Sequence, residues 1–206
     1  MITTLKLIAR QALPALSLLL TTAAHAQDFD LAQLGQQLSE PEIIRGAFTQ
    51  EKHLRALPQP LVSLGRFVLA RDHGLLWLLQ QPVQQDYRVS EKGIARRDPS
   101  GWQPTDQQGP AARQNELFLA VLQGDTDALR DDFELELSGT AQVWTLSLTP
   151  RSKLLGQIFT AILISGGATV ERIELLEAQG DSTLLLLSDS QIDDQLSPTE
   201  RHDFAD

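Results

Sequence analysis

The stretch VLARDHGLLWLLQQP, residues 68–82, decides the kind of fold that this chain can adopt. Asp72-His73-Gly74 separates two apolar runs, which is a pattern typical of a β-hairpin turn. Residues 75–79 are apolar at every position, so a strand here would be apolar on both of its faces. The run is far shorter than the roughly 20 residues that a membrane-spanning helix needs. We therefore predict a strand with protein or a ligand packed against each face.

Hairpin patterns continue on both sides of this stretch. Residues 45–54 alternate between two faces, and residues 86–98 read as a hairpin around a turn at 90–93. Residues 154–165 fit either a helix face or a strand, and we favour the strand because the following run continues the hairpin rhythm. The strictest alternation lies about Gly139, where three apolar residues of one strand (Phe133, Leu135, Leu137) face three of the next (Trp144, Leu146, Leu148).

Helical patterns are few and short. Residues 28–38 and 113–123 have apolar side chains at helical spacing, and residues 127–131 add one more turn. Ser197 with Glu200 forms a capping box that begins a short helix in the tail. Residues 98–112 are rich in Pro, Gly, Gln and Asp and are predicted to be a loop. The fold class expected is mainly β with helices (α+β), with eight to eleven antiparallel strands and two or three helices.

The first 26 residues have the layout of a secretory signal peptide. Lys6 and Arg10 precede an apolar run at 12–20, and Ala24-His25-Ala26 is a small-x-small cleavage site, so cleavage is expected before Gln27. The alternative, an uncleaved membrane anchor, is disfavoured because the apolar run is too short. We expect residues 1–26 to be the signal peptide, residues 27–206 to form a single domain, and the mature chain to lie in a bacterial periplasm.

The absence of cysteine and the acidic net charge restrict the classes of partner that the chain can bind. The chain has no cysteine, which excludes disulfides, thiolate metal sites and a lipidated cysteine anchor. Its net charge is −10, and removal of Lys6 and Arg10 with the signal peptide makes the mature chain −12. Such an acidic protein is a poor partner for nucleic acid or an anionic membrane surface. We expect a monomer with no stable membrane insertion, which interacts with cationic or apolar partners.

Enzyme signatures are missing from the sequence. It contains no nucleophile elbow, zinc-protease helix motif, phosphate loop or dinucleotide fingerprint. The three histidines of the mature chain, His53, His73 and His202, do not have the spacing of metal ligands. Asp72-His73 and Ser165-Gly166-Gly167 are more simply explained as hairpin turns. We predict no catalytic residue, no metal, no cofactor and no enzymatic activity.

The apolar residues are mostly aliphatic. The chain has seven Phe, three Trp and one Tyr, so Leu and Ile dominate its apolar surface. A cavity for flexible acyl chains would be lined in this way, whereas a site for sugars or nucleobases would need more stacking rings. The alternative is that the leucine-rich strands simply pack against the helices, and composition alone favours that alternative.

The order of several motifs changes this balance. GAFTQEKHL is followed by PLVSLGRFVLARDHGLLWLLQQP, in which Gly65 precedes Arg71, Trp77 comes six positions after that Arg, and Pro82 follows. WTLSLTP and VERIELLEAQGDSTLLLLSD resemble later strands of the same family. With these motifs, most of residues 28–190 resembles the LolA-like periplasmic carriers of outer-membrane lipoproteins.

The resemblance implies an antiparallel sheet curled into an incomplete (half) β-barrel that is closed by a lid of short helices. It implies a carrier that shuttles acylated lipoproteins from an inner-membrane transporter to an outer-membrane acceptor. Asp72 stands where the family usually has Pro, and the tail LSPTERHDF lacks the usual family ending. A glycolipid or other acyl lipid as cargo, or a non-transporting lipid-sensing module on the same fold, therefore remain alternatives.

The resemblance also suggests which residues bind cargo. Arg71 is expected to be a latch that hydrogen-bonds the lid helices while the cavity is empty, and the Trp77 face of its strand is expected to be concave. The acyl cavity and lid are expected to include Phe48, Phe67, Leu69, Leu75, Trp77, Leu79, Leu117, Val121, Trp144 and Leu146.

Overall fold

The computed structural model describes residues 29–105 and 110–205. The expected signal peptide, residues 1–26, and its cleavage site before Gln27 lie outside the described residues. Among the residues that are described, none of the helices combines the length and the apolar character needed to cross a membrane.

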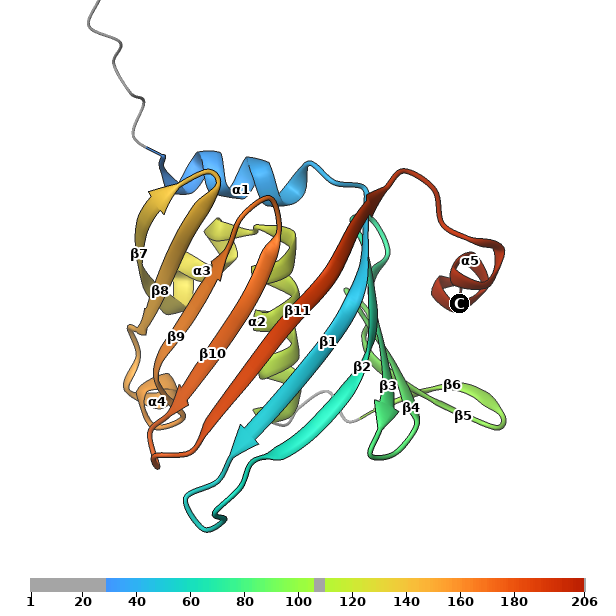
Figure 1. The fold of residues 1–206 in the computed structure, drawn as a ribbon, viewed down its shortest axis with the longest axis horizontal. Coiled ribbons are helices and arrows are strands. Elements are labelled where there is room, and N and C mark those ends of the chain that lie inside the picture. Colours follow the sequence, from blue (N-terminus) through green and yellow to red (C-terminus); the bar gives the residue numbers. More distant parts are fainter. Residues whose placement is uncertain (1–28, 106–109, 206) are drawn as a thin grey trace, which may run out of the picture.

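In the described residues, eleven antiparallel strands form one continuous sheet (Figure 1). Their order is β6-β5-β4-β3-β2-β1-β11-β10-β9-β8-β7, so consecutive strands are neighbours except β6 and β7, and the first and last strands, β1 and β11, pair near the centre. The sheet is open, with β6 and β7 at its edges. The strands are β1 (Ile43–His53), β2 (Leu61–Ala70), β3 (Gly74–Gln81), β4 (Gln85–Ser90), β5 (Gly93–Asp98), β6 (Gly101–Pro104), β7 (Phe133–Thr140), β8 (Val143–Pro150), β9 (Phe159–Gly166), β10 (Val170–Glu177) and β11 (Ser182–Asp193).

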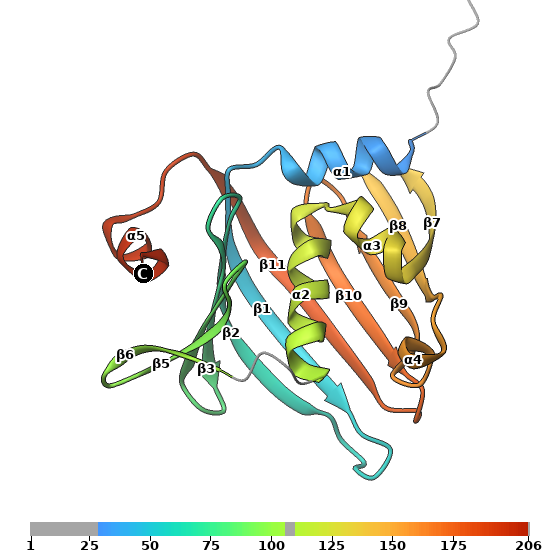
Figure 2. The same cartoon turned by 180° about the vertical axis from the view of Figure 1, so that it is seen from behind.

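Five helices are present in the described chain: α1 (Leu31–Ser39), α2 (Pro110–Gln123), α3 (Thr126–Asp132), α4 (Lys153–Gly156) and α5 (Pro198–Phe204). Figure 2 shows α2 in front of the sheet, with α1 along one end of it, and α5 on the other side of β2 and β3. The short helices begin at side-chain caps: Asp30 caps α1, and the predicted Ser197–Glu200 capping box begins α5.

The two apolar faces of strand β3 are covered by different parts of the chain. Leu75 belongs to the large core between the sheet and helices α1, α2 and α3, and Trp77 and Leu79 pack against that core. Leu76 belongs to a second cluster under α5, which Leu78 extends. Each face of the strand is therefore covered by a different part of the chain, and the Trp77 face is the one that α2 covers.

The β2–β3 hairpin predicted at Asp72-His73-Gly74 is confirmed, with Ala70 opposite Gly74. Gly74 has a φ of +103°, and a Cβ atom at this position would collide with the carbonyl of Val89 on β4. The turn therefore requires glycine for both conformation and space. The strand chosen at 154–165 is confirmed for 159–165 but is wrong at its start, where Lys153–Gly156 form helix α4. The β7–β8 hairpin is also confirmed, but its turn lies at 141–142, and Gly139 is a strand residue opposite Trp144.

Two further expectations were wrong. The predicted loop at 98–112 contains strand β6, and α2 begins at Pro110 rather than at residue 113. The turn-forming residues there make a tight hairpin, in which Gly101 has a φ of +113° and Trp102 pairs with Arg97. The helix count was also too low, because α4 is a single turn that begins at the cap Ser152 and gives little periodic signal.

Candidate functional site: a cavity between the sheet and helix α2

An apolar cavity of about 360 Å³ lies between the sheet and α2. Ligand pockets in proteins have volumes of about 300–1,000 Å³, so its size is sufficient for a small ligand. The cavity is lined by residues from seven strands and one helix: Gln50, Leu75, Trp77, Tyr87, Val89, Ile94, Leu117, Phe118, Val121, Ile162, Ile173, Leu175, Thr183 and Leu185.

Strand register explains why residues far apart in sequence meet there. Ile173 is directly opposite Leu185, and Leu175 is directly opposite Thr183, in the pairing of β10 with β11. Directly opposite residues of an antiparallel pair point to the same face, and residues two apart share that face. The hairpins therefore place alternate residues of each strand in the wall of one cavity.

The indole of Trp77 is part of this wall and is held on three sides. It stacks on Phe48 with ring centroids 3.6 Å apart and meets the edge of Phe118 from α2 at 5.3 Å. Phe67 lies 6.4 Å away on the neighbouring strand. Phe48 on β1 lies directly opposite Gly65 on β2. Its ring fits there because Gly65 has no Cβ atom, which would overlap the ring. The Gly65 and Trp77 of the family motif thus belong to one packing unit.

The ten residues expected to form the acyl cavity and lid divide into two groups. Leu75, Trp77, Leu117 and Val121 line the cavity. The other six lie in the apolar core around it and do not line it: Phe48, Phe67, Leu69, Leu79, Trp144 and Leu146. The reason is clear for Phe48 and Phe67, because the Trp77 ring lies against both of them. Trp144 instead donates an Nε1 hydrogen bond of 2.8 Å to the carbonyl of Gly167.

Four of the ten cavity residues that the sequence analysis missed come from β10 and β11. Ile173, Leu175 and Leu185 alternate with more exposed neighbours, which is a detectable signal for the buried face of a strand. That signal does not say which buried residues surround empty space. Gln50, Tyr87 and Thr183 were missed because polar side chains are seldom assigned to an apolar wall.

Arg71 lies where helices α1 and α2 end. Its guanidinium donates a hydrogen bond to the backbone carbonyl of Glu40, the C-cap residue of α1. Its backbone carbonyl accepts a hydrogen bond of 3.2 Å from the Gln123 side chain, at the end of α2. Its backbone N–H donates to the carbonyl of Glu42 at 2.9 Å. The β2–β3 turn therefore contacts both helices through one residue.

The middle of α1 is attached at a second point. The Gln37 side-chain amide donates to the carbonyl of Gly167 at 2.6 Å and to that of Ala141 at 3.2 Å. These carbonyls lie in the β9–β10 and β7–β8 turns. Leu34 and Leu38 of α1 are buried in the core beneath. Helix α1 is therefore held to one end of the sheet by hydrogen bonds as well as by apolar contacts.

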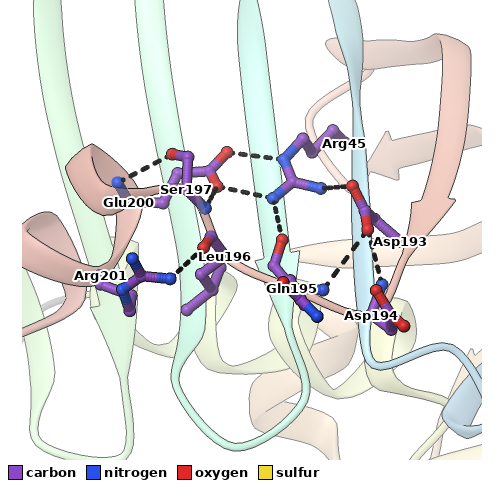
Figure 3. A network of polar contacts seen from close by, with 8 residues as sticks. All are labelled: Arg45, Asp193, Asp194, Gln195, Leu196, Ser197, Glu200 and Arg201. Carbon is purple, nitrogen blue, oxygen red and sulfur yellow. Dashed lines mark hydrogen bonds and ion pairs between the residues drawn. The ribbon is translucent and has the colours of Figure 1, made fainter.

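The tail is fastened to the opposite face by a charged network (Figure 3). Arg45 on β1 donates to Glu200 through Nε at 2.7 Å and Nη2 at 2.6 Å, and to Asp193 through Nη1 at 2.9 Å. The hydrogen bonds from Arg45 lower the pKa of Glu200 to about 2, and the same contact with Glu200 raises the pKa of Arg45. Backbone N–H groups of Asp194 and Gln195 lower the pKa of Asp193. We call Arg45, Asp193 and Glu200 the tail clamp.

The end of α5 is attached to the sheet as well. Arg88 donates to the carbonyls of Asp203 and Ala205 at 3.1 and 2.6 Å, and Arg97 pairs with the Asp203 carboxylate. Trp102 stacks near both guanidinium groups. These contacts bury Phe204 against the second apolar cluster. Helix α5 therefore covers the face of the sheet that carries Leu76, and the cavity lies on the opposite face, under α2.

Known proteins agree with this architecture. The family profile described as "Outer membrane lipoprotein carrier protein LolA" matches residues 39–200. The chain belongs to the LolA family. An "Outer-membrane lipoprotein carrier protein" of Pseudomonas fluorescens (strain Pf0-1) is 25% identical over 180 residues, which are 87% of this chain and 85% of that protein.

Solved structures of MucB show the same fold at low identity. MucB in the MucA/MucB complex of Pseudomonas aeruginosa has a TM-score of 0.50 and 14% identity, over 82% of this chain and 58% of that one. This chain thus spans less than two thirds of MucB. A LolA superfamily protein of Nitrosomonas europaea has a TM-score of 0.49 and 11% identity, over 81% of this chain and 94% of that one.

Membership of the LolA family has general consequences. The family consists of periplasmic carriers that are transport proteins and not enzymes, which confirms the expectation that this chain is not an enzyme. Among the described residues, no cluster of His, Cys, Asp or Glu could hold a metal ion. His73, half of the Asp72-His73 pair considered above, packs its ring 5.5 Å from that of Phe204.

Proposed function

We propose that residues 27–206 form a single periplasmic carrier domain that binds the acyl chains of lipoproteins and shuttles them from the inner to the outer membrane. The observation that supports this most strongly is the mainly apolar cavity of about 360 Å³ with Trp77 in its wall and α2 over it. Each buried methylene contributes about 0.8 kcal/mol, so a carrier needs such a cavity to compete with a membrane. The open sheet serves as the incomplete barrel, and helices α1, α2 and α3 serve as its lid.

Arg71 acts as the latch of this lid in the proposed cycle. Its hydrogen bond to the end of α1 and its contact with Gln123 of α2 hold both helices against the β2–β3 turn. A hydrogen bond from a charged donor contributes about 1.5–3 kcal/mol, which burial of only a few methylenes offsets. Cargo entry therefore opens the latch, and loss of cargo closes it. Because guanidinium stays charged, the latch works at any physiological pH.

Delivery requires two partners, an inner-membrane transporter and an outer-membrane acceptor. A mature chain of charge −12 docks most favourably on basic surfaces, and the docking rate falls as salt increases. The protein works as a monomer without inserting into the membrane. A glycolipid or other acyl lipid is the alternative cargo, because the tail differs from the family ending.

A second function deserves a test because the fold resembles that of MucB, which forms a complex with MucA. On this alternative, the chain is a lipid-sensing module that binds a protein partner and transfers nothing. It would use the same cavity, so binding of lipid alone does not separate the two functions.

The experiment has two stages. Purified mature protein is first titrated with a fluorophore that carries an acyl chain, and lipids that copurify from the native host are identified by mass spectrometry. Lipid transfer between donor and acceptor vesicles is then followed with and without the protein. Binding with accelerated transfer supports the carrier, and binding without transfer supports the sensor. If the fluorophore does not bind and no lipid copurifies, both the carrier and the sensor function are refuted.

A further inference from the structure

The two edges of the open sheet differ in their capacity to pair with a further strand. Edge strand β6 is four residues long and ends at Pro104, which has no N–H to donate. Edge strand β7 is eight residues long, contains no proline and keeps one continuous register with β8 (Figure 1). Long, regular edge strands can pair with another chain, so natural proteins usually shorten, bend or cover them. Of the two edges, β7 is therefore the one suited to a partner strand.

The register with β8 determines which backbone groups of β7 point outwards. The N–H of Arg151 donates to the carbonyl of Asp132 at 2.9 Å, at the start of this ladder. In an antiparallel pair, alternate residues exchange backbone hydrogen bonds, so every second residue after Asp132 also directs its N–H and C=O to β8. Leu135 and Leu137 lie between those residues and direct their backbone groups away from β8. Within residues 29–105 and 110–205, β8 is the only strand that pairs with β7, so these outward groups have no strand partner.

The side chains of β7 alternate between acidic and aliphatic residues. Glu134 and Glu136 are exposed, whereas Leu135 and Leu137 are half-buried and pack against the core on the opposite face. In the part of the chain that the structure describes, neither of these carboxylates forms an ion pair. The edge therefore presents two unpaired negative charges on the outer face of the sheet and two aliphatic side chains on the inner face.

Charge decides which kind of strand fits this edge. If a second copy added its own β7 as an antiparallel strand that continues the sheet, the glutamates of the two copies would lie opposite one another on the outer face. Like charges in that position are destabilising. A strand with Lys or Arg at every second residue instead places cations opposite Glu134 and Glu136, and the aliphatic residues between them cover Leu135 and Leu137. Such addition of an extended segment to an exposed sheet edge is a general mode of peptide recognition.

We propose that β7 is a docking site for an extended segment of a partner protein in which basic and aliphatic residues alternate, and that this segment joins the sheet as an additional antiparallel strand. The backbone groups of Leu135 and Leu137 supply the hydrogen bonds, and Glu134 and Glu136 select the basic side chains. The inference goes beyond the proposed carrier function, because it requires neither the cavity nor a lipid.

The probe is a fluorescein-labelled peptide of sequence TVKVKVT, whose binding to the mature protein is measured by fluorescence anisotropy. Placed antiparallel to β7, it sets its lysines opposite Glu136 and Glu134 and its first two valines opposite Leu137 and Leu135. Two N-methylated versions have the same side chains and charge. Methylation of the two lysine nitrogens, which face solvent, should change binding little. Methylation of the first two valine nitrogens, which face β7, removes two backbone hydrogen bonds and should weaken binding about tenfold.

Two double variants test the role of charge. Glu134→Gln with Glu136→Gln should weaken the unmodified peptide about fivefold at low ionic strength, and the difference should shrink in high salt because salt screens exposed charges. Glu91→Gln with Glu171→Gln is the matched control. It removes the same charge from exposed sites in the β4–β5 turn and on β10, and should change the affinity little.

Hydrogen exchange reports the backbone pairing itself. The amides of Leu135 and Leu137 point away from β8, so they should exchange rapidly in the free protein. Saturating unmodified peptide should slow the exchange of both amides, because they become donors to the added strand.

Several results would overturn the proposal. Strand addition is refuted if the unmodified peptide does not bind, if the two methylated peptides bind equally, or if exchange at Leu135 and Leu137 stays fast. Binding that is insensitive to the loss of both glutamates refutes the basic partner. Slower exchange at rising protein concentration without peptide identifies a second copy as the occupant instead. The methylated peptides are compared on wild-type protein, so the test decides even if a variant fails to fold. Because no lipid is used, failure here leaves the carrier function intact, and failure of the lipid titration leaves this docking site intact.

Discussion

Replacing Glu200 with Gln should loosen the C-terminal helix and change how stability depends on pH. Glu200 accepts two hydrogen bonds from Arg45, at 2.7 and 2.6 Å, and one from the backbone N–H of Ser197 at 2.7 Å. Gln keeps the size of the side chain and can still accept from Ser197. The substitution therefore removes the charge of the tail clamp and leaves the capping box in place.

The magnitude follows from the pKa of Glu200, which falls from 4.5 to about 2. A pKa change of this size corresponds to about 3 kcal/mol if it is fully converted into stability. The side chains of Arg45 and Glu200 are 18% and 15% exposed, so solvent screens part of the interaction. We therefore expect Glu200→Gln to cost about 1–2 kcal/mol at neutral pH.

The sign of the pH dependence is determined by the lowered pKa. The folded protein holds Glu200 ionised, so the stabilisation is fully present above the unfolded value of 4.5 and is lost as the pH falls towards 2. The difference in unfolding free energy between wild type and Glu200→Gln should be constant above pH 4.5 and should shrink progressively below it.

Urea unfolding at a series of pH values measures this difference, and hydrogen exchange at 198–204 detects a helix that detaches before the sheet unfolds. Glu136→Gln, on the exposed side of β7, is the matched control and should change stability little at any pH. Equal stability and equal exchange rates for wild type and Glu200→Gln at neutral pH would show that the tail clamp does not hold α5.

Three further predictions concern the lid and delivery. Arg71→Leu should fold normally and load acyl fluorophore, but vesicle-to-vesicle transfer should slow, and wild-type transfer rates would refute the latch. Trp144→Phe removes the 2.8 Å hydrogen bond to Gly167 and should lower the unfolding free energy by about 1 kcal/mol in urea titrations; an unchanged value would mean that the Gln37 hydrogen bond to the same carbonyl is sufficient. Binding to anionic vesicles should be weak and binding to a basic surface should fall with added salt; strong, salt-insensitive vesicle binding would contradict the role assigned to the acidic surface.

Local patterns in the sequence determined most of the secondary structure. Apolar alternation indicated the two strands of the β7–β8 hairpin, although the turn is two residues beyond Gly139, and Ser197 with Glu200 indicated the start of α5. These signals are readable because period, caps and turn residues act over only a few positions. The prediction of a loop at 98–112 was wrong for the same reason. Turn-forming residues are equally compatible with a loop and with the tight hairpin between β5 and β6, and the local sequence does not distinguish the two.

Only the tertiary structure decided which apolar residues surround the cavity and which fill the core. Phe48 and Trp77 are both apolar and both on the α2 side of the sheet, yet Trp77 lines the cavity and Phe48 lies against its ring. Empty space depends on how the side chains of several strands and α2 fit together, and periodicity within one strand carries no information about that fit.

The sequence by itself determined the family, the antiparallel strands and the two apolar faces of residues 75–79. The tertiary structure decided what covers each face: α2 and the cavity on the Trp77 side, α5 and the tail clamp on the Leu76 side. It also brought Gln50 and Thr183, which are distant in sequence, into one wall through the β1–β11 pairing. The physical reason is that alternation along a strand is a local property, whereas pairing between the first and last strands depends on the whole chain.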